Sequence, residues 1–130
     1  SQMDTNDVTY KIIGCIYKVH SALGPGLLEN TYEICLVHEL IKVVLKVDRQ
    51  KLLPVRYDNI EVDAGYRIDI LVEDRVIPEL KSIENIAEIH KAQILTYLRL
   101  ANKEIGLLIN FNVSDMKKGI KRLVLSKKQA

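Results

Sequence analysis

Acidic side chains stand inside two apolar segments near the middle of the chain. Asp69 lies in one of them, and Glu79 and Lys81 lie in the next. Charges embedded in apolar strands tend to be partly buried, and a buried charge needs a partner of opposite sign or a metal ion. Charge pattern alone favours a lattice of salt bridges with Arg67 and Lys81. Carboxylates of this kind also bind Mg²⁺-like cations, which promote hydrolysis of phosphodiesters.

The segments are predicted to be the two strands of a hairpin. Tyr66–Val72 and Val76–Lys81 are rich in β-branched and apolar residues, and Glu73–Arg75 forms a short turn between them. A three-residue loop of this kind fixes which residues of the two strands face each other. A slip of one residue would undo that pairing. Pro78 has no N–H to offer a neighbouring strand, so it predicts an edge, a bulge or a bend.

This loop places Asp69 opposite Glu79 and Arg67 opposite Lys81. Side chains alternate along a strand, so the four share one face. Facing Cβ atoms lie roughly 4.5–5.5 Å apart, where like charges are destabilising. The two carboxylates therefore need a cation, either from the neighbouring Arg67 and Lys81 or from a divalent metal ion.

The rest of the chain supplies helices and strands to hold this hairpin. Hydrophobic periodicity predicts a mixed α/β order of helix, helix, three strands, helix, strand and strand. Besides the hairpin, the predicted elements are a helix from an N-cap at Asp7 to Gly24, a helix over Leu27–Leu45, a strand over Leu52–Tyr57 before an Asp58–Asn59 turn, a helix over Asn85–Ala101, a buried strand over Ile105–Phe111, a turn or short helix over Asn112–Lys118, and a strand over Ile120–Leu125.

Length and composition predict one globular domain. The chain has 130 residues, of which 48% are hydrophobic and 28% charged, values ordinary for a soluble protein. We assign residues 7–126 to the domain, residues 1–6 to a tag remnant and a disordered N-terminus, and residues 127–130 to a basic tail. No apolar run approaches the roughly 18 residues that a membrane span needs. Cys15 and Cys35 do not form a metal or redox motif, which favours reduced thiols in the cytoplasm.

The formal net charge of +2 is too small to identify a nucleic-acid-binding protein by itself. All charged residues after Asp115 are nevertheless basic. They are Lys117, Lys118, Lys121, Arg122, Lys127 and Lys128. This stretch would either contact phosphates or form a solvated terminus.

The hairpin residues resemble a known signature. Asp69 followed by Glu79-x-Lys81 on the next strand looks like the motif of the PD-(D/E)XK nuclease superfamily. The segment Gly26–Tyr32 matches G-x-x-E-x-x-Y, which names a small family assigned to that superfamily. The resemblance extends from about Ile12 to Val124.

The resemblance implies an α/β fold with a restriction-endonuclease-like core, in which helices flank a four-stranded mixed sheet. It also implies hydrolysis of phosphodiester bonds in DNA with Mg²⁺ or Mn²⁺. By residue, Asp69, Glu79 and the backbone carbonyl of Leu80 would be metal ligands, and Glu29 matches the helix-borne acid of the superfamily. Lys81 would position or activate the attacking water, or stabilise charge in the transition state.

Two helical features have alternative explanations. With Gly26 as N-cap, Glu29 would be the third helical residue, where capping and the helix dipole favour glutamate. Gln93 and Tyr97 share a helix face and resemble the Gln-x-x-x-Tyr motif of RecB-type nucleases, which would place Gln93 near the metal and Tyr97 near the DNA backbone. They would equally suit a core helix. For His20 we favour a structural or hydrogen-bonding role.

Several functions follow from these residues. The leading one is a DNA nuclease that processes ends, as RecB-type enzymes do. A Holliday-junction-resolvase-like endonuclease, working as a homodimer across a branched substrate, is the nearest alternative. The other class is a catalytically inactive module that binds nucleic acid or a protein. Within the sequence, no Gly-rich phosphate loop, nucleophile elbow or zinc-finger spacing suggests a different enzyme.

Overall fold

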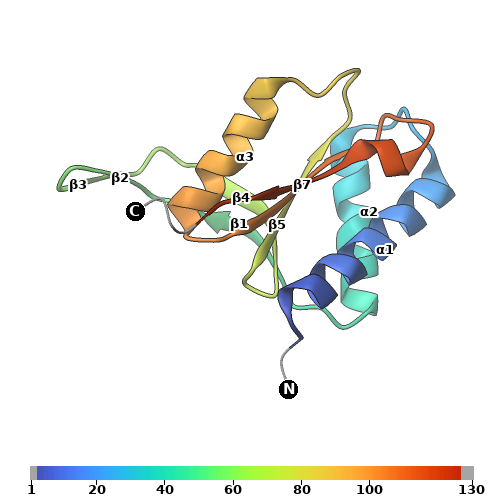
Figure 1. Cartoon of the computed structure of the whole chain (residues 1–130), viewed down its shortest axis with the longest axis horizontal. Helices are drawn as coiled ribbons and strands as arrows, with labels where there is room; N and C mark the ends of the chain where they lie inside the picture. Colours follow the sequence, from blue (N-terminus) through green and yellow to red (C-terminus); the bar gives the residue numbers. More distant parts are fainter. Residues whose placement is uncertain (1–2, 127–130) are drawn as a thin grey trace.

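Three helices surround one mixed sheet in the computed structural model, which describes residues 3–126 (Figure 1). The predicted tag remnant at residues 1–2 and the predicted tail at residues 127–130 lie outside the described residues. The elements, in chain order, are α1 (Thr5–Leu23), α2 (Glu29–Lys42), β1 (Val47–Leu52), β2 (Val55–Tyr57), β3 (Ile60–Val62), β4 (Arg67–Val72), β5 (Val76–Lys81), α3 (Glu88–Ala101), β6 (Ile105–Asn110), the 3-10 helix η1 (Met116–Gly119) and β7 (Ile120–Val124).

The sheet has five strands in the order β1-β4-β5-β6-β7. Only β5 and β6 run parallel, connected through α3, and the other neighbours are antiparallel. The α/β class and the mixed sheet flanked by helices are confirmed, and they are consistent with a restriction-endonuclease-like fold. The sheet has one strand more than the four predicted. None of the helices in the described part of the chain is long and apolar enough to cross a membrane.

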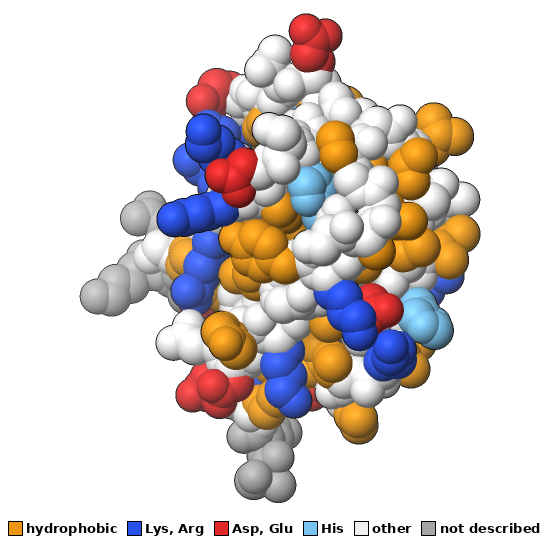
Figure 2. Space-filling view, turned by 90° about the vertical axis from the view of Figure 1, so that its right-hand side faces the viewer, with side chains coloured by type: hydrophobic (Ala, Val, Ile, Leu, Met, Phe, Trp, Pro, Cys, Tyr) orange, Lys and Arg blue, Asp and Glu red, His pale blue; other side chains and the backbone are white. Residues whose placement is uncertain are grey.

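The helices cover the two faces of the sheet unequally. α1 and α2 lie on one face, where they bury the larger core with Ile70, Leu80 and Ile109 (Figure 1). α3 covers the other face with a smaller core of Leu53, Ile68, Leu71, Ile77 and Leu98. Gly106 of β6 lets α3 approach closely, because a Cβ atom there would lie 2.7 Å from Ile94 Cδ1. The outer surface of α1 and α2 mixes apolar and charged side chains (Figure 2). Tyr10 of α1 and Ile41 of α2 are among the exposed apolar residues.

The first helix begins earlier than predicted. Asp4, not Asp7, is its N-cap, and the Asp4 carboxylate accepts a hydrogen bond from the Asp7 N–H at 2.9 Å. Residues assigned to a disordered terminus therefore include the start of α1. The helix ends at Gly24, as predicted, where a φ of 69° favours glycine.

The loop between α1 and α2 is held by Tyr32. Its hydroxyl donates to the Gly24 carbonyl at 2.5 Å and accepts from the Leu27 N–H at 3.1 Å. Its ring is fully buried and stacks on Phe111 of the segment after β6, with centroids 4.3 Å apart. Tyr32 thus fixes the position of the first turn of α2 relative to the sheet.

The strand predicted over residues 52–57 is wrong in its bounds. Leu53 and Pro54 separate β1 from β2, and β1 extends back to Val47. The turn predicted at Asp58–Asn59 is confirmed, since it connects Tyr57 to Ile60 in a small two-stranded sheet. The second helix is shorter than predicted at both ends, whereas the third begins later than predicted and ends at Ala101 as predicted. β5 has the predicted bounds.

Pro78 lies in β5, which is a central strand, so the edge interpretation is wrong. Pairing between β4 and β5 is recorded at Val72 and Val76, which confirms the predicted three-residue loop. β5 pairs with β6 along its whole length, from Val76 to Lys81. Pro78 has no N–H to donate, which accounts for the interruption on the β4 side.

Candidate active site

The end of β5 brings Glu79 and Lys81 to the α3 face of the sheet. They follow Ile77 by two and four residues and so share its face of the strand, and Ile77 packs in the smaller core beneath α3. Their side chains are only 15% and 18% exposed, and Lys81 Nζ lies 3.9 Å from Glu79 Oε2. A carboxylate and an ammonium group are thus held together in a largely desolvated position.

Asp69 approaches Glu79 from the neighbouring strand. The ladder between β4 and β5 is formed at Val72 and Val76, and the pairing of Asp69 with Glu79 further along the hairpin stays a prediction. Ile70 and Val72 belong to the larger core, so alternation directs Asp69 toward the opposite face, where Glu79 lies. The Asp69 carboxylate is close enough to act on the ionisation of Glu79.

The pKa of Glu79 is strongly perturbed. Burial, followed by the negative charges of Asp69, Glu29 and Glu33, raises the pKa of Glu79 to about 7, although Lys81 opposes the shift. Burial and, to a smaller extent, repulsion by the neighbouring carboxylates therefore disfavour the charged form of Glu79. A cation placed among these carboxylates would relieve that repulsion.

α2 contributes two of these acids. Leu28 is the N-cap of α2 and makes no side-chain cap bond, so Glu29 is the first helical residue and the predicted Gly26 cap is wrong. Glu29 is exposed, whereas Glu33, one turn later, is 13% exposed and pairs with Arg49 of β1 at 2.9 Å. Sequence reasoning missed Glu33. Its i, i+4 spacing from Glu29 would have found it, because that spacing puts both on one helix face.

Gln50 is a second residue that sequence reasoning missed. Its side-chain amide donates to Asp69 Oδ1 at 3.3 Å. Its φ of 53° is left-handed although both neighbouring residues, Arg49 and Lys51, pair regularly with β4. Next to Asp69, Ile68 turns into the smaller core, so the alternation of β4 is interrupted at the same place. A polar glutamine in a polar segment gave no sequence signal of this conformation.

The predicted helical pair does not contact the acids. Gln93 and Tyr97 line a separate pocket on α3 with Tyr66, and no hydrogen bond or ion pair within residues 3–126 joins either to Asp69 or Glu79. His20 has the hydrogen-bonding role we favoured, since its Nε2 lies 2.7 Å from the Val113 carbonyl oxygen.

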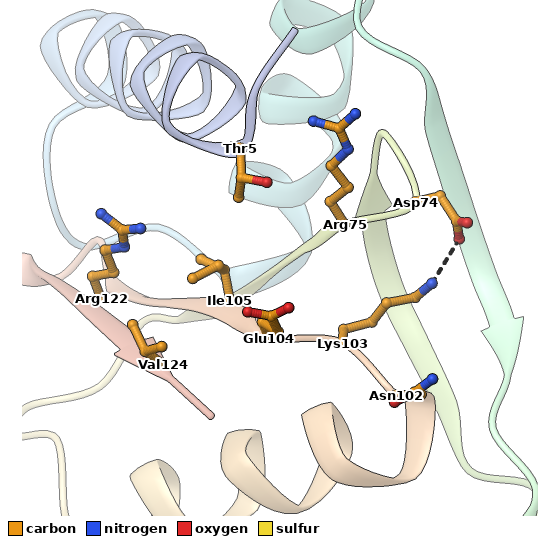
Figure 3. Close-up of a pocket in the computed structure, with 9 residues that line it drawn as sticks. All are labelled: Thr5, Asp74, Arg75, Asn102, Lys103, Glu104, Ile105, Arg122 and Val124. Carbon is orange, nitrogen blue, oxygen red and sulfur yellow. Dashed lines mark hydrogen bonds and ion pairs between the residues drawn. The ribbon is translucent and has the colours of Figure 1, made fainter. Parts of the chain in front are cut away.

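A further pocket, of about 450 Å³, lies at the other end of β5 (Figure 3). The β4–β5 turn forms part of its wall, and Lys103 pairs there with Asp74 at 3.0 Å. Arg75 of the same turn donates to the Met3 carbonyl. Because Glu79 and Lys81 end the strand that this turn begins, the pocket is not part of the acidic cluster.

The acidic residues can bind a hard cation only together with ligands from outside the protein. Across the described residues, no three His, Cys, Asp or Glu side chains are grouped closely enough to hold a metal ion by themselves. Mg²⁺ commonly takes only one or two carboxylates and completes its shell with water and substrate phosphate. Asp69 and the largely buried Glu79 fit that requirement, because they place mutually repelling oxygen ligands on adjacent strands.

Comparison with known proteins decides the family. A family model described as the PD-(D/E)XK nuclease superfamily matches residues 6–123. The chain belongs to the PD-(D/E)XK nuclease superfamily. No curated protein and no solved structure matches it. Membership of the superfamily implies a nuclease with a nucleic-acid substrate, and PD-(D/E)XK nucleases generally use divalent metal ions.

In a PD-(D/E)XK nuclease, the conformation of Gln50 has a testable consequence. Gln50→Gly would remove the strain of a left-handed side-chain-bearing residue and the bond to Asp69 together. We expect the free energy of unfolding, measured in urea, to rise by about 0.5–1 kcal/mol. We expect nuclease activity to fall by about fivefold, as for loss of one hydrogen bond.

The matched control is Lys51→Gly in the same strand, since Lys51 pairs regularly with Ile68 and has no positive φ. That change should destabilise the protein. A Gln50→Gly protein that is both less stable and fully active would contradict the inference that Gln50 is strained and that its bond to Asp69 supports activity.

Proposed function

We propose that this chain is a Mg²⁺- or Mn²⁺-dependent nuclease that cleaves DNA at the cluster of Asp69, Glu79 and Lys81. The observation that carries the proposal is that the largely buried Glu79 lies near three other carboxylates, with the Lys81 ammonium group 3.9 Å away. Three further carboxylates, those of Asp69, Glu29 and Glu33, act on Glu79. The cations paired within this group are Lys81 with Glu79 and Arg49 with Glu33, which leaves room for a divalent cation in addition.

The proposed metal ligands are Asp69, Glu79, the backbone carbonyl of Leu80 and, when substrate is bound, Glu29. The bound ion supplies positive charge to the scissile phosphate and lowers the pKa of a water molecule. Lys81 holds the attacking water or the developing charge on the phosphate, because its ammonium group is fixed beside Glu79. Lysine suits this position, since it is a compact cation that can also transfer a proton.

Two finer assignments belong to the same proposal. The assignment of Gly26–Tyr32 to the G-x-x-E-x-x-Y motif is supported by the roles of two of its residues. Tyr32 holds the loop before α2, and Glu29 is the first residue of that helix. We therefore assign the chain to that family within the superfamily. A cytoplasmic location agrees with Cys15 and Cys35, which are both free thiols.

For the reaction, we favour processing of DNA ends over junction resolution. The exposed Gln93 and the partly buried Tyr97 line a pocket on α3, on the sheet face that carries Glu79, so a strand entering the site would pass them. Junction resolution would need a homodimer. A catalytically inactive binding module is the second candidate, favoured by the absence of a self-sufficient metal centre within residues 3–126.

The test is a cleavage assay with single-stranded, duplex and branched DNA and with RNA, in Mg²⁺, Mn²⁺ or EDTA. We expect metal-dependent cleavage of DNA by the wild type and none by Asp69→Asn or Glu79→Gln. Glu84→Gln is the matched control, since Glu84 is an exposed glutamate beyond β5. Equal residual cleavage by all proteins would indicate a contaminant and reject the proposal, whereas binding without cleavage would support the inactive module.

A further inference from the structure

A pocket of about 570 Å³ lies between α3 and the start of β4. Its volume is in the range of pockets that bind small organic molecules. Its walls are mostly apolar, with Ile89 and Leu100 among them, and its polar groups are few. It is separate from the acidic cluster but lies at the same end of the sheet, because antiparallel β4 begins beside the end of β5.

Two tyrosines give this pocket its character. The rings of Tyr66 and Tyr97 meet edge to face, with centroids 6.5 Å apart and an interplanar angle of 66°. Tyr66 is 48% exposed, so much of its ring is available to a ligand. Aromatic side chains of this kind stack with nucleobases whatever their sequence.

The polar groups of the pocket suit the edge of a base. Gln93 presents an amide that can both donate and accept, and Thr96 presents a hydroxyl. Arg67 follows Tyr66 directly and is exposed, which provides a cation for a phosphate next to a stacked base. An aliphatic side chain from a protein partner would use the apolar walls but neither the amide nor the cation.

The pocket is also within reach of the cluster. Tyr66 and Asp69 are three residues apart on one extended segment, which corresponds to about 10 Å. A nucleotide beside the scissile phosphate can therefore reach the tyrosines while that phosphate lies near Glu79 and Lys81. A base can do this only when it is unpaired, because a paired base is stacked within the duplex.

We propose that the Tyr66–Tyr97 pocket binds an unpaired nucleobase of the strand being cleaved, which makes single-stranded or frayed DNA the preferred substrate. This inference rests on the proposed nuclease function, because it assumes that the scissile phosphate lies at the acidic cluster. It assigns to Tyr66 a substrate-binding role and to Tyr97 contact with a base rather than with the DNA backbone.

The test measures binding separately from cleavage. Fluorescence anisotropy with labelled oligothymidine, and with a duplex of equal length, is recorded in Mg²⁺ for the Glu79→Gln protein and for the same protein with Tyr66→Leu or Tyr66→Phe. We expect Tyr66→Leu to weaken binding of oligothymidine roughly tenfold and to leave duplex binding unchanged. Tyr66→Phe keeps the ring and should bind normally. Tyr10→Leu is the matched control, an 80% exposed tyrosine on α1.

A second measurement uses the ligand instead of the protein. A series of oligonucleotides carries one abasic position each, at successive places along the strand. We expect weaker binding when the missing base is the one that would occupy the pocket. With that oligonucleotide, Tyr66→Leu should cause no further loss of affinity. No measurable binding of oligothymidine, equal binding by Tyr66→Leu, or an equal loss for single strand and duplex would each overturn the inference. Cleavage by Glu79→Gln in the same samples would instead contradict the proposed function and leave the comparison of binding valid.

Discussion

Lys81→Met should lower the rate of DNA cleavage about 10²–10³-fold, the loss expected when one group that stabilises transition-state charge is removed. The 18% exposed Lys81 ammonium group is held 3.9 Å from Glu79, so bulk solvent cannot substitute for it fully. Methionine keeps the length and the apolar contacts of the side chain. The measurement is the single-turnover rate on the preferred DNA substrate in Mg²⁺.

The same variant should change the pH dependence of its residual activity. Lys81 lowers the pKa of Glu79, so its removal should raise that pKa further above the ordinary value. If ionised Glu79 is required, the acid limb of the rate profile moves to higher pH. Lys91→Met is the matched control, because Lys91 is a partly exposed lysine on α3 that pairs with Glu88. Activity of Lys81→Met within a few-fold of the wild type would exclude a catalytic role for Lys81.

Glu79→Gln should abolish cleavage and, at neutral pH, make the metal-free protein more stable. Burial and neighbouring carboxylates raise the pKa of Glu79 from 4.5 to about 7. Between these values the folded protein binds a proton that the unfolded chain releases, so the stability of the wild type falls as pH rises through this window. Glutamine cannot ionise and avoids that loss, which amounts to up to about 3 kcal/mol above pH 7.

Urea unfolding at pH 5 and pH 8 in EDTA measures this difference. The gap between Glu79→Gln and the wild type should widen with pH, whereas Glu84→Gln should follow the wild type. Saturating Mg²⁺ should stabilise the wild type at pH 8 by about 3 kcal/mol at one hundred times the dissociation constant, and should stabilise Glu79→Gln less. A gap that is constant with pH would show that Glu79 is not held in an unfavourable charged state.

The sequence predicted the hairpin well because its signals are local. Alternation, a short polar turn and a run of β-branched residues define β5 and the three-residue loop before it. These features predicted, without information from the rest of the chain, that Asp69 lies near Glu79, and the Asp69 carboxylate does act on the pKa of Glu79.

The contributions of β1 and α2 were less predictable. β1 reads Val-Asp-Arg-Gln-Lys-Leu, which lacks apolar alternation, and it becomes a strand by pairing with β4. The left-handed φ of Gln50 and the approach of Glu33 to Glu79 depend on contacts between residues far apart in the chain. Local propensity carries no information about such contacts.

The two outer strands have a consequence for how copies of this chain behave at high concentration. β1 and β7 each leave one row of backbone N–H and C=O groups unpaired within the described sheet. Such rows invite another chain to add a strand, and lysines and arginines at an edge discourage it. Arg49 and Lys51 lie on one edge, and Lys121 and Arg122 on the other. These charges repel a second copy and attract a polyanion, so one set of residues would limit aggregation while the protein searches for nucleic acid.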